Sequence, residues 1–183
     1  MKYILNRLIQ QEQLSKAEAK EVLLQISNGE FSDLQIASFL TVFMMRSISV
    51  EELEGFRDAL LELCIPVDFQ GETVMDLCGT GGDGQNTFNV STAASFVVAA
   101  MDVKVAKHGN YGVSSVSGSS NVLEAMGIKF SNEQGFLDRC LDKANIAILH
   151  APLFHPAMKN VAPIRKSLAL KTFFNMLGPM VNP

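Results

Sequence analysis

The sequence of 183 residues has little of what marks several large classes of protein. Its three cysteines, Cys64, Cys78 and Cys140, are an odd number at wide spacing, which favours reduced thiols in a cytoplasmic protein over a disulfide framework. Fifteen Lys and Arg stand against 19 Asp and Glu, a net charge of −4, so we expect no nucleic-acid partner. No apolar run is long enough to span a membrane, and Arg7 interrupts the first one, so we expect neither a membrane span nor a signal peptide.

What the chain does have is a core-forming composition, with 48% hydrophobic residues. Residues 1–66 have a helical pattern in which Ser-x-x-Glu/Gln occurs three times before an apolar-periodic segment, which is typical of capping boxes. These motifs begin at Ser15, Ser32 and Ser49. The sequence therefore predicts a small helical domain over residues 1–66, joined by further helices from about residues 160–183.

Two details refine this prediction. Gly29 lies where a glycine that ends a helix belongs. The segment 34–44 is apolar on nearly all sides, which indicates a helix buried on more than one side, either in the centre of a bundle or against a partner subunit.

A different pattern follows, in which short apolar runs alternate with helical segments. Such alternation predicts a parallel sheet covered on both faces, with ligands at the carboxyl ends of the strands. We expect this partial α/β domain over residues 70–155. The expected strands are 73–77, 103–106, 128–130 and 146–149, and the expected helices are 91–101, 121–126 and 133–143.

A glycine-rich loop, Gly79–Gly84, lies between the first expected strand and helix. Glycines let backbone N–H groups approach an anion closely, and a helix start adds further donors, so the loop indicates a phosphate site. The glycines also match the dinucleotide fingerprint, but no helix opens within the motif, and Lys107 rather than an acid follows the second strand. Asp83 is either a ligand contact, through a cation or a sugar hydroxyl, or a turn residue that bonds its own backbone.

A second polar cluster, Lys107–Asn110, precedes a Ser/Gly-rich loop. Lysine supplies a mobile positive charge for phosphate, and the loop supplies hydroxyl donors. Alone, this cluster is a solvated loop; opposite the glycine loop, it favours a binding site.

The motifs together resemble the anthranilate phosphoribosyltransferase family, and the resemblance extends over the whole chain. Several runs agree in order and spacing, which is more specific than any one glycine motif. The runs are Gly79–Asp83, Asn89–Thr92, Lys107–Asn110, Ser117–Ser119, Val122–Ala125, His155–Lys159, Pro163–Arg165, Thr172–Pro179 and Asn182–Pro183.

The resemblance implies a fold of the nucleoside phosphorylase and phosphoribosyltransferase type: a helical domain joined by hinges to an α/β domain. It implies transfer of phosphoribosyl from phosphoribosyl pyrophosphate (PRPP) to the amine of anthranilate in tryptophan biosynthesis. Mg²⁺ is the implied cofactor, and the implied assembly is a homodimer through the helical domain.

The resemblance also implies which residues bind each group, and no residue is implied as a catalytic acid or base. For anthranilate they are Gly79, Asn110 and Arg165, with His108 and His155 either lining its path or simply packed. For Mg²⁺ the implied ligand is Ser91. For PRPP they are Gly79, Gly82, Asp83, Thr87, Asn89, Val90, Ser91, Thr92, Lys107, Ser115 and Ser119.

The chain departs from the family in two respects. Polar positions near the second loop differ, which puts the individual phosphate contacts in question; they are Tyr111, Val116, Ser120, Asn121 and Lys171. Family members are also about twice as long, so the resemblance implies a partial chain, without the acidic metal-binding pair. The alternatives are a pyrimidine-nucleoside phosphorylase-like enzyme, a non-catalytic nucleic-acid-binding relative and a helical dimerisation module.

Overall fold

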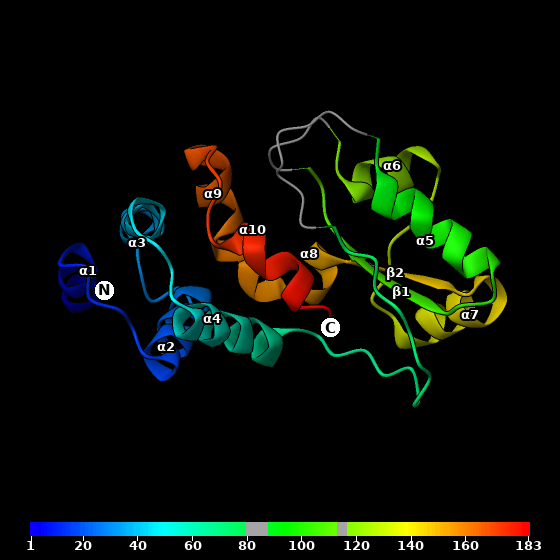
Figure 1. The fold of residues 1–183 in the computed structure, drawn as a ribbon, viewed down its shortest axis with the longest axis horizontal. Helices are drawn as coiled ribbons and strands as arrows, with labels where there is room; N and C mark the ends of the chain where they lie inside the picture. Colours follow the sequence, from blue (N-terminus) through cyan, green and yellow to red (C-terminus); the bar gives the residue numbers. More distant parts are fainter. Residues whose placement is uncertain (80–87, 113–116) are drawn as a thin grey trace. The chain divides into compact units, whose positions relative to one another are not determined.

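The computed structural model describes residues 1–79, 88–112 and 117–183 (Figure 1). The chain forms two compact units, which we call the helical unit and the α/β unit. The helical unit comprises Met1–Cys64 and His155–Val181, and the α/β unit comprises Ile65–Phe154 and Asn182–Pro183. The helical unit is therefore built from two segments that are far apart in the sequence.

Four helices form the first segment of the helical unit, and three of them begin at the predicted capping boxes. In each box the serine hydroxyl accepts from the backbone of the Glu or Gln three residues later, whose side chain accepts from the serine backbone. Gly29 follows α2 with a φ of +78°, as predicted for a glycine that ends a helix. The helices are α1 (Lys2–Ile9), α2 (Lys16–Ser27), α3 (Asp33–Met45) and α4 (Val50–Leu63).

The second segment of the helical unit consists of short helices, and it supplies part of the core. The ring of Phe173 stacks on Phe56 with centroids 4.4 Å apart and meets Phe39 and Phe43 edge to face. Aromatic pairs of this kind add to the gain from burial. The elements are η1 (Pro156–Asn160), α9 (Ala162–Leu168), α10 (Phe174–Leu177) and η2 (Gly178–Met180).

Helix α3 buries one side within this chain. Phe39, Leu40 and Phe43 are buried, whereas Leu34 and Met45 are 81% and 80% exposed. Leu34 and Met45 are eleven residues apart, about three turns of helix, so both lie on the same outer face. Of the two predicted surroundings, a bundle centre is therefore wrong for this chain, and a partner on the outer face stays a prediction.

Gly55 is where α2 and α4 approach each other closely. A Cβ atom at this position would lie 2.3 Å from the carbonyl oxygen of Lys16 and 2.8 Å from the Cβ of Ala19. Glycine is therefore required by packing at this point, although it lies inside a helix, where its backbone freedom costs stability.

The sheet of the α/β unit contains two parallel strands, β1 (Val105–Gly109) and β2 (Ile146–His150), in the register Val105↔Ile146. The expected strand 103–106 is thus displaced toward its carboxyl end. The expected strand 73–77 is reduced to one parallel bridge, Met75↔Val105.

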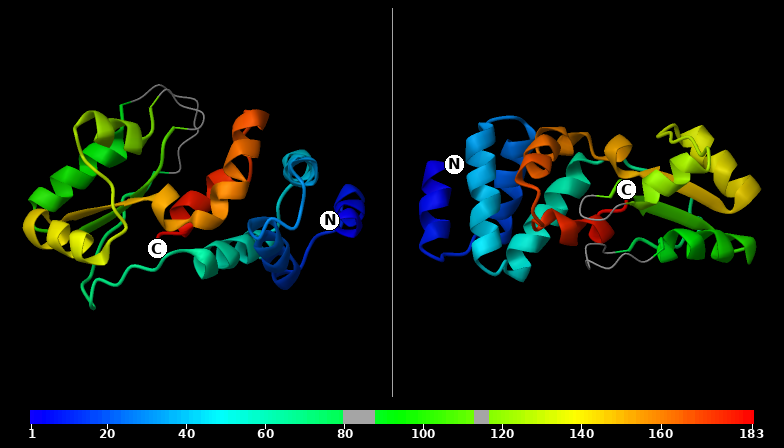
Figure 2. Two further views of the ribbon diagram at one scale, coloured as in Figure 1. Left: turned by 180° about the vertical axis from the view of Figure 1, so that it is seen from behind. Right: turned by 90° about the horizontal axis from the view of Figure 1, so that it is seen from above.

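Helices cover both faces of these strands, as predicted for a parallel sheet. Figure 2 shows α5 (Val90–Ala100) and α7 (Gln134–Ala144) on opposite faces. Helix α6 (Ser119–Ala125) and the short α8 (Ala151–Phe154) complete the described elements of the unit.

The strand expected at 128–130 is wrong. Gly127, with a φ of +81°, ends α6, and the N–H of Ile128 bonds back to the carbonyl of Leu123. The ring of Phe130 then stacks on His150, 4.3 Å away, so its apolar side chain is used in packing and not in a ladder.

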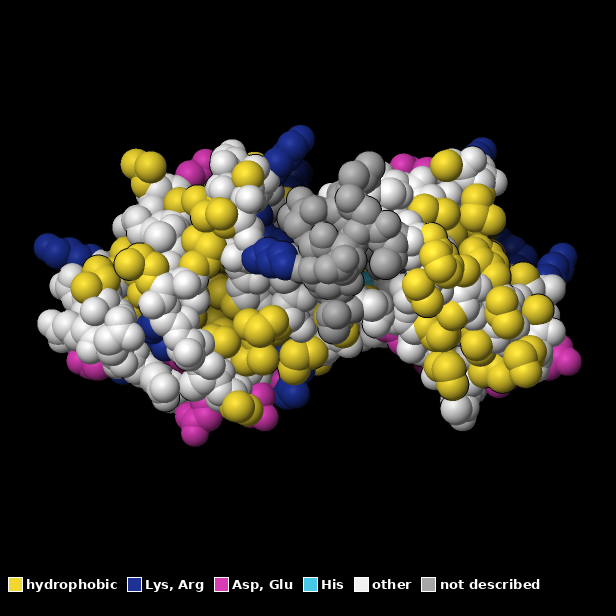
Figure 3. Space-filling view, turned by 45° about the horizontal axis from the view of Figure 1, so that its top comes forward, with side chains coloured by type: hydrophobic (Ala, Val, Ile, Leu, Met, Phe, Trp, Pro, Cys, Tyr) yellow, Lys and Arg dark blue, Asp and Glu magenta, His cyan; other side chains and the backbone are white. Residues whose placement is uncertain are grey.

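Apolar side chains also gather on the outside of the α/β unit, on the face that carries α5 (Figure 3). Val97 and Met101 of this segment are 60% and 72% exposed. Such a surface is more apolar than a solvent-facing helix ordinarily needs.

Candidate functional site

The carboxyl end of the first expected strand meets the start of α5. A Cβ added at Gly79 would lie 3.3 Å from the hydroxyl oxygen of Ser91, so these two predicted site residues are neighbours. Asn89 precedes the helix, and its side chain makes no cap bond to the first turn. The start of a helix carries backbone N–H groups without partners inside the helix, and these can bind another acceptor. The hydroxyl of Thr92, a residue only 3% exposed, has no hydrogen-bond partner among the described residues. Open N–H groups and a buried free hydroxyl together suit an anion.

Lys107 lies in the middle of β1, and its side chain reaches the carboxyl end of the first expected strand. It is 1% exposed, and its ammonium nitrogen is 3.2 Å from the carbonyl oxygen of Leu77. Burial lowers the pKa of Lys107, while the neighbouring Cys78 and Asp76 act in the opposite direction. An ammonium group has three donors, so Lys107 keeps donors for a ligand while it holds the strand end.

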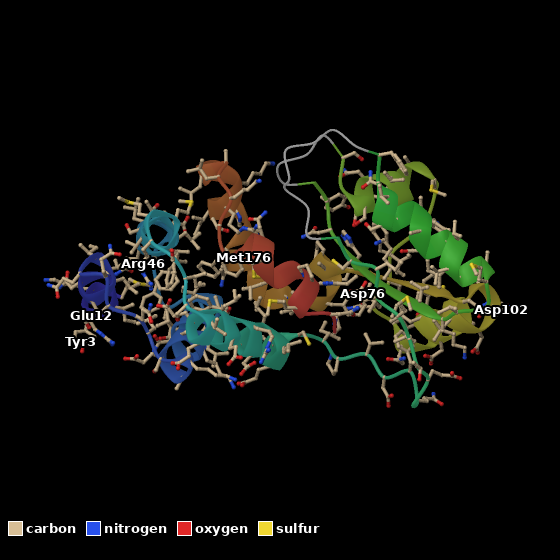
Figure 4. All side chains as sticks on the ribbon, in the orientation of Figure 1. Tyr3, Glu12, Arg46, Asp76, Asp102 and Met176 are labelled. Carbon is tan, nitrogen blue, oxygen red and sulfur yellow. The ribbon has the colours of Figure 1, made fainter. Side chains whose placement is uncertain are left out.

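Asp76, labelled in Figure 4, is a half-buried carboxylate that the sequence analysis does not assign to the site. Its carboxylate accepts a hydrogen bond from the backbone N–H of His108 at 3.2 Å and another from the side chain of Asn182. Asn182 in turn donates to the carbonyl of Ala106. Burial raises the pKa of Asp76, although these bonds and Lys107 oppose the shift. The signal was a carboxylate within the mostly apolar segment 73–77.

Asn110 lies just beyond the end of β1 and is held by α6. Its carbonyl oxygen accepts from the backbone of Ser120 at 3.2 Å and from the hydroxyl of Ser119 at 3.3 Å. A Cβ added at Gly118 would lie 2.2 Å from the nitrogen of Gly112, so only glycine allows the chain to pass so closely. The structure thus brings Ser119 to Asn110, two positions assigned to different substrates.

A buried histidine at the end of β2 supports this corner of the α/β unit. His150 is 5% exposed, and its Nδ1 lies 2.8 Å from the hydroxyl of Ser120. Its ring stacks on Phe130 and meets Tyr111 edge to face. Tyr111 donates to Glu124 at 2.6 Å. Two positions that depart from the family, Tyr111 and Ser120, therefore have a common structural role around a residue that the sequence did not single out.

Arg165 and His155 belong to the helical unit. Arg165 donates from Nη2 to Oδ1 of Asn175 at 3.2 Å, and its guanidinium carbon is 5.2 Å from the ring centroid of Phe174. Its Nε is buried without a partner among the described residues, and burial lowers the pKa of the group. The Nε2 of His155 lies 2.9 Å from the carbonyl oxygen of Val181, which packs this histidine into its unit.

Other predicted site residues lie outside the described residues. They are Gly82, Asp83, Thr87 and Ser115, together with the departure at Val116. The helix start exposes Val90, and His108, in β1, is buried.

The described residues do not form a magnesium site on their own. In the ranges 1–79, 88–112 and 117–183, no group of three His, Cys, Asp or Glu side chains could hold a metal ion. Ser91 offers one neutral hydroxyl, whereas Mg²⁺ in phosphate sites usually takes one or two carboxylates as well as the oxygens of the substrate.

Comparison with known proteins connects these features to a family. The family model described as "Glycosyl transferase family, a/b domain" matches residues 71–183, and the one described as "Glycosyl transferase family, helical bundle domain" matches residues 2–64. The chain belongs to this glycosyl transferase family. Together, the two matches cover nearly all of the sequence.

Individual members of the glycosyl transferase family are closely similar. The anthranilate phosphoribosyltransferase of Christiangramia forsetii is 72% identical over the whole chain, which covers 55% of that protein. The one from Flavobacterium psychrophilum is 70% identical, with 56% of it covered. The predicted resemblance is confirmed, and the chain spans about half the length of these relatives.

Solved structures of the family agree in fold. The anthranilate phosphoribosyltransferase of Thermus thermophilus matches with a TM-score of 0.86 at 37% identity, over 98% of this chain and 54% of that one. The Saccharomyces cerevisiae enzyme, solved with PRPP and Mg, matches with a TM-score of 0.87 at 31% identity, over 98% and 54%. Among the described residues, no helix of this family member has the length and apolar character that crossing a membrane would require.

Proposed function

We propose that this chain forms the PRPP-binding and anthranilate-binding part of an anthranilate phosphoribosyltransferase. The observation that carries the proposal is the uncapped start of α5, where Ser91 adjoins Gly79 and the buried hydroxyl of Thr92 lacks a partner among the described residues. A phosphorylated ligand supplies the acceptors that these donors lack. The high identity to relatives of that name supports this choice among the members of the family.

In this proposal the α/β unit holds the donor substrate. The N–H groups at the start of α5 and the hydroxyls of Ser91 and Thr92 bind phosphate oxygens, with the positive end of the helix dipole behind them. Lys107 adds a positive charge from a buried position, where electrostatic attraction is stronger than in water.

Arg165, in the helical unit, binds the acceptor substrate. Its planar guanidinium pairs with the carboxylate of anthranilate. The amine nitrogen attacks C1 of the phosphoribosyl group as the bond from C1 to the pyrophosphate oxygen breaks. Pyrophosphate leaves with that electron pair, and the amine loses a proton to solvent. An aromatic amine is already nucleophilic at neutral pH, so orientation contributes most of the rate enhancement.

The proposal extends to magnesium and to cellular location. Because no group of three His, Cys, Asp or Glu side chains among the described residues could hold a metal ion, we expect Mg²⁺ to arrive with PRPP and not to bind beforehand. We also propose a cytoplasmic location, in keeping with three unpaired cysteines.

The test uses an extended chain, which we define as this sequence joined to the part of the Christiangramia forsetii relative that it does not match. In this extended chain, Thr92→Val removes the unpartnered hydroxyl and keeps the shape. We expect PRPP affinity in calorimetry to fall roughly 10- to 100-fold, because a hydrogen bond to a charged group is lost. Stability should stay equal or rise, since the variant buries no unsatisfied hydroxyl.

The matched control is Ser95→Ala, one turn further along α5. Ser95 is buried, and its hydroxyl already donates to the carbonyl of Ser91, so PRPP affinity should not change. Equal PRPP affinity in the Thr92 variant and the unchanged chain would contradict the proposed site. Binding of inorganic phosphate in preference to PRPP would favour the phosphorylase alternative.

A further inference from the structure

Asn175 forms a hydrogen bond to the buried guanidinium of Arg165 that involves no opposite charge. The bond from Nη2 to Oδ1 measures 3.2 Å. Among the described residues no acid lies close enough to shift the pKa of this guanidinium, and its Nε is buried without a described partner. Burying a charge next to a neutral partner is unfavourable, so such an arrangement suits a place where a ligand supplies the opposite charge.

The orientation of the Asn175 side chain is fixed by a second bond. Its Oδ1 also accepts from the backbone N–H of Thr172 at 3.1 Å, while its own backbone N–H bonds to the carbonyl of Thr172. Both groups that reach this side chain are donors. The oxygen of the amide must therefore face Arg165, and the amide cannot be flipped without losing both bonds.

The chemical type of this partner has a consequence for binding. A carboxylate in place of the amide would form a paired ion with Arg165 and compete with any acidic ligand. An amide oxygen orients the guanidinium while leaving its full positive charge available. The hydroxyl of Thr172, also buried without a described partner, belongs to the residue whose backbone fixes Asn175 and adds a second free polar group.

We propose that Asn175 is a positioning residue, which orients Arg165 through a neutral hydrogen bond and so sets the preference of the site for a carboxylate-bearing acceptor. This inference rests on the proposed function of Arg165, and it adds a physical reason for that site to favour acidic over neutral aromatic amines. The guanidinium keeps donors for a bidentate contact because Asn175 engages only Nη2.

The experiment compares two acceptors in the extended chain, anthranilate and its neutral analogue 2-aminobenzamide. In the unchanged protein we expect kcat/KM to favour anthranilate strongly. Asn175→Asp should raise KM for anthranilate about tenfold or more and leave KM for PRPP unchanged, because an internal carboxylate then neutralises Arg165. The ratio of the two acceptors should shift toward the amide, and the melting temperature should not fall.

Asn175→Ser is the companion variant, with a shorter neutral acceptor, and it keeps the proposal testable if the Asp variant does not fold. We expect it to raise KM for anthranilate less than Asn175→Asp does, while the preference for the carboxylate persists. A merely structural role predicts instead that both variants lower stability and affect both substrates equally. A folded Asp variant with an unchanged acceptor preference would overturn the proposal, as would a Ser variant that loses this preference.

Arg165→Lys separates this inference from the proposed function. If this change leaves KM for anthranilate unaltered, Arg165 does not bind the carboxylate, and the positioning role falls with it. If it raises that KM while Asn175→Asp has no effect, only the positioning role is wrong. If the unchanged extended chain transfers nothing to anthranilate from PRPP, the proposed function itself is wrong.

Discussion

Glu52 and Arg46 form the most deeply buried ion pair among the described residues, with side chains 0% and 4% exposed. Arg46 lies just beyond α3, where Figure 4 labels it. The Glu52 carboxylate also accepts from the backbone of Leu14 and Ser49. One side chain thus joins the start of α4, the end of α3 and the segment before α2.

We expect Glu52→Ala to destabilise the helical unit by about 3–5 kcal/mol, because it leaves Arg46 buried without its partner. Denaturant unfolding followed by circular dichroism measures this loss. Glu54→Ala, on the same helix, removes only a partly exposed contact with Lys16 and should cost under about 1 kcal/mol. Equal losses in the two variants would show that the buried pair has no special role.

The pair of Glu52 and Arg46 also makes the stability of the helical unit depend on pH. Burial alone would raise the pKa of Glu52, but the bonds from Arg46, Ser49 and Leu14 outweigh it, and the pKa is lowered. Its stabilising contribution is therefore present above the carboxyl pKa of the unfolded chain and is lost as pH falls through the lowered value.

His150 makes a second, separate contribution to pH dependence. Burial lowers its pKa, although Glu124 opposes the shift. The neutral ring is favoured in the folded state, so we expect the α/β unit to lose stability as pH falls below the usual histidine range and through the lowered pKa. Unfolding in denaturant at several pH values should show this loss, and His150→Gln should reduce it. A pH dependence that is the same in both proteins would contradict the assignment to His150.

Helix packing predicts opposite effects on stability when two helical glycines are replaced by alanine. Gly55→Ala should destabilise the α2–α4 contact by about 1–3 kcal/mol, since its Cβ would overlap the carbonyl of Lys16. Gly135→Ala, in α7, meets only the ends of side chains at 3.5 Å or more and should stabilise by about 0.5–1 kcal/mol. Melting curves of both variants test the pair. A stabilising Gly55 variant would show that α2 and α4 can separate without cost.

Elements with local signals could be predicted from the sequence, whereas elements that depend on distant partners could not. The capping boxes at Ser15, Ser32 and Ser49 each involve residues three apart, and all three form. The segment 128–130 has the composition of a strand, but Phe130 finds the ring of His150 instead. Pairing in a sheet is decided by neighbours that the local sequence does not specify.

The candidate site divides in the same way. Gly79, Ser91 and Lys107 stood out because glycine density and a cation after a strand have a direct chemical meaning. Asp76 and Asn175 did not stand out in the sequence, because each forms hydrogen bonds with a residue that is distant in the sequence or lies in another element. Their roles follow from the partners to which the fold brings them.

The outer face of α3 is the basis for a prediction about assembly. Leu34 and Met45 are both exposed, and Ser38 and Thr41 between them bond to carbonyls of their own helix. Burying this face costs little free energy, because its ends are apolar and its two hydroxyls keep their hydrogen bonds within the helix. We therefore expect a homodimer through the helical unit. Light scattering at micromolar concentration should give the mass of a dimer, and Leu34→Glu should give that of a monomer. A monomeric mass for the unchanged chain would contradict this expectation.

We expect the 183-residue chain by itself to show no useful turnover of anthranilate. No group of three His, Cys, Asp or Glu side chains among its described residues could hold Mg²⁺, so we expect the charge of departing pyrophosphate to be stabilised less than in the extended chain. The assay follows anthranilate fluorescence with PRPP and Mg²⁺, in parallel with the extended chain. Turnover within about tenfold of the extended chain would show that the metal chemistry is complete in these residues.

The composition of the helical unit has a consequence for synthesis on the ribosome. Phe56 stacks on Phe173, and the whole α/β unit apart from its last two residues is translated between them. The first four helices therefore emerge with an aromatic surface whose partner is added only after that unit has been made. A nascent chain of this kind is exposed to chaperones and to aggregation for the length of that delay. A circular permutation that begins at His155 would place the two segments of the unit next to each other in translation order and shorten the exposure.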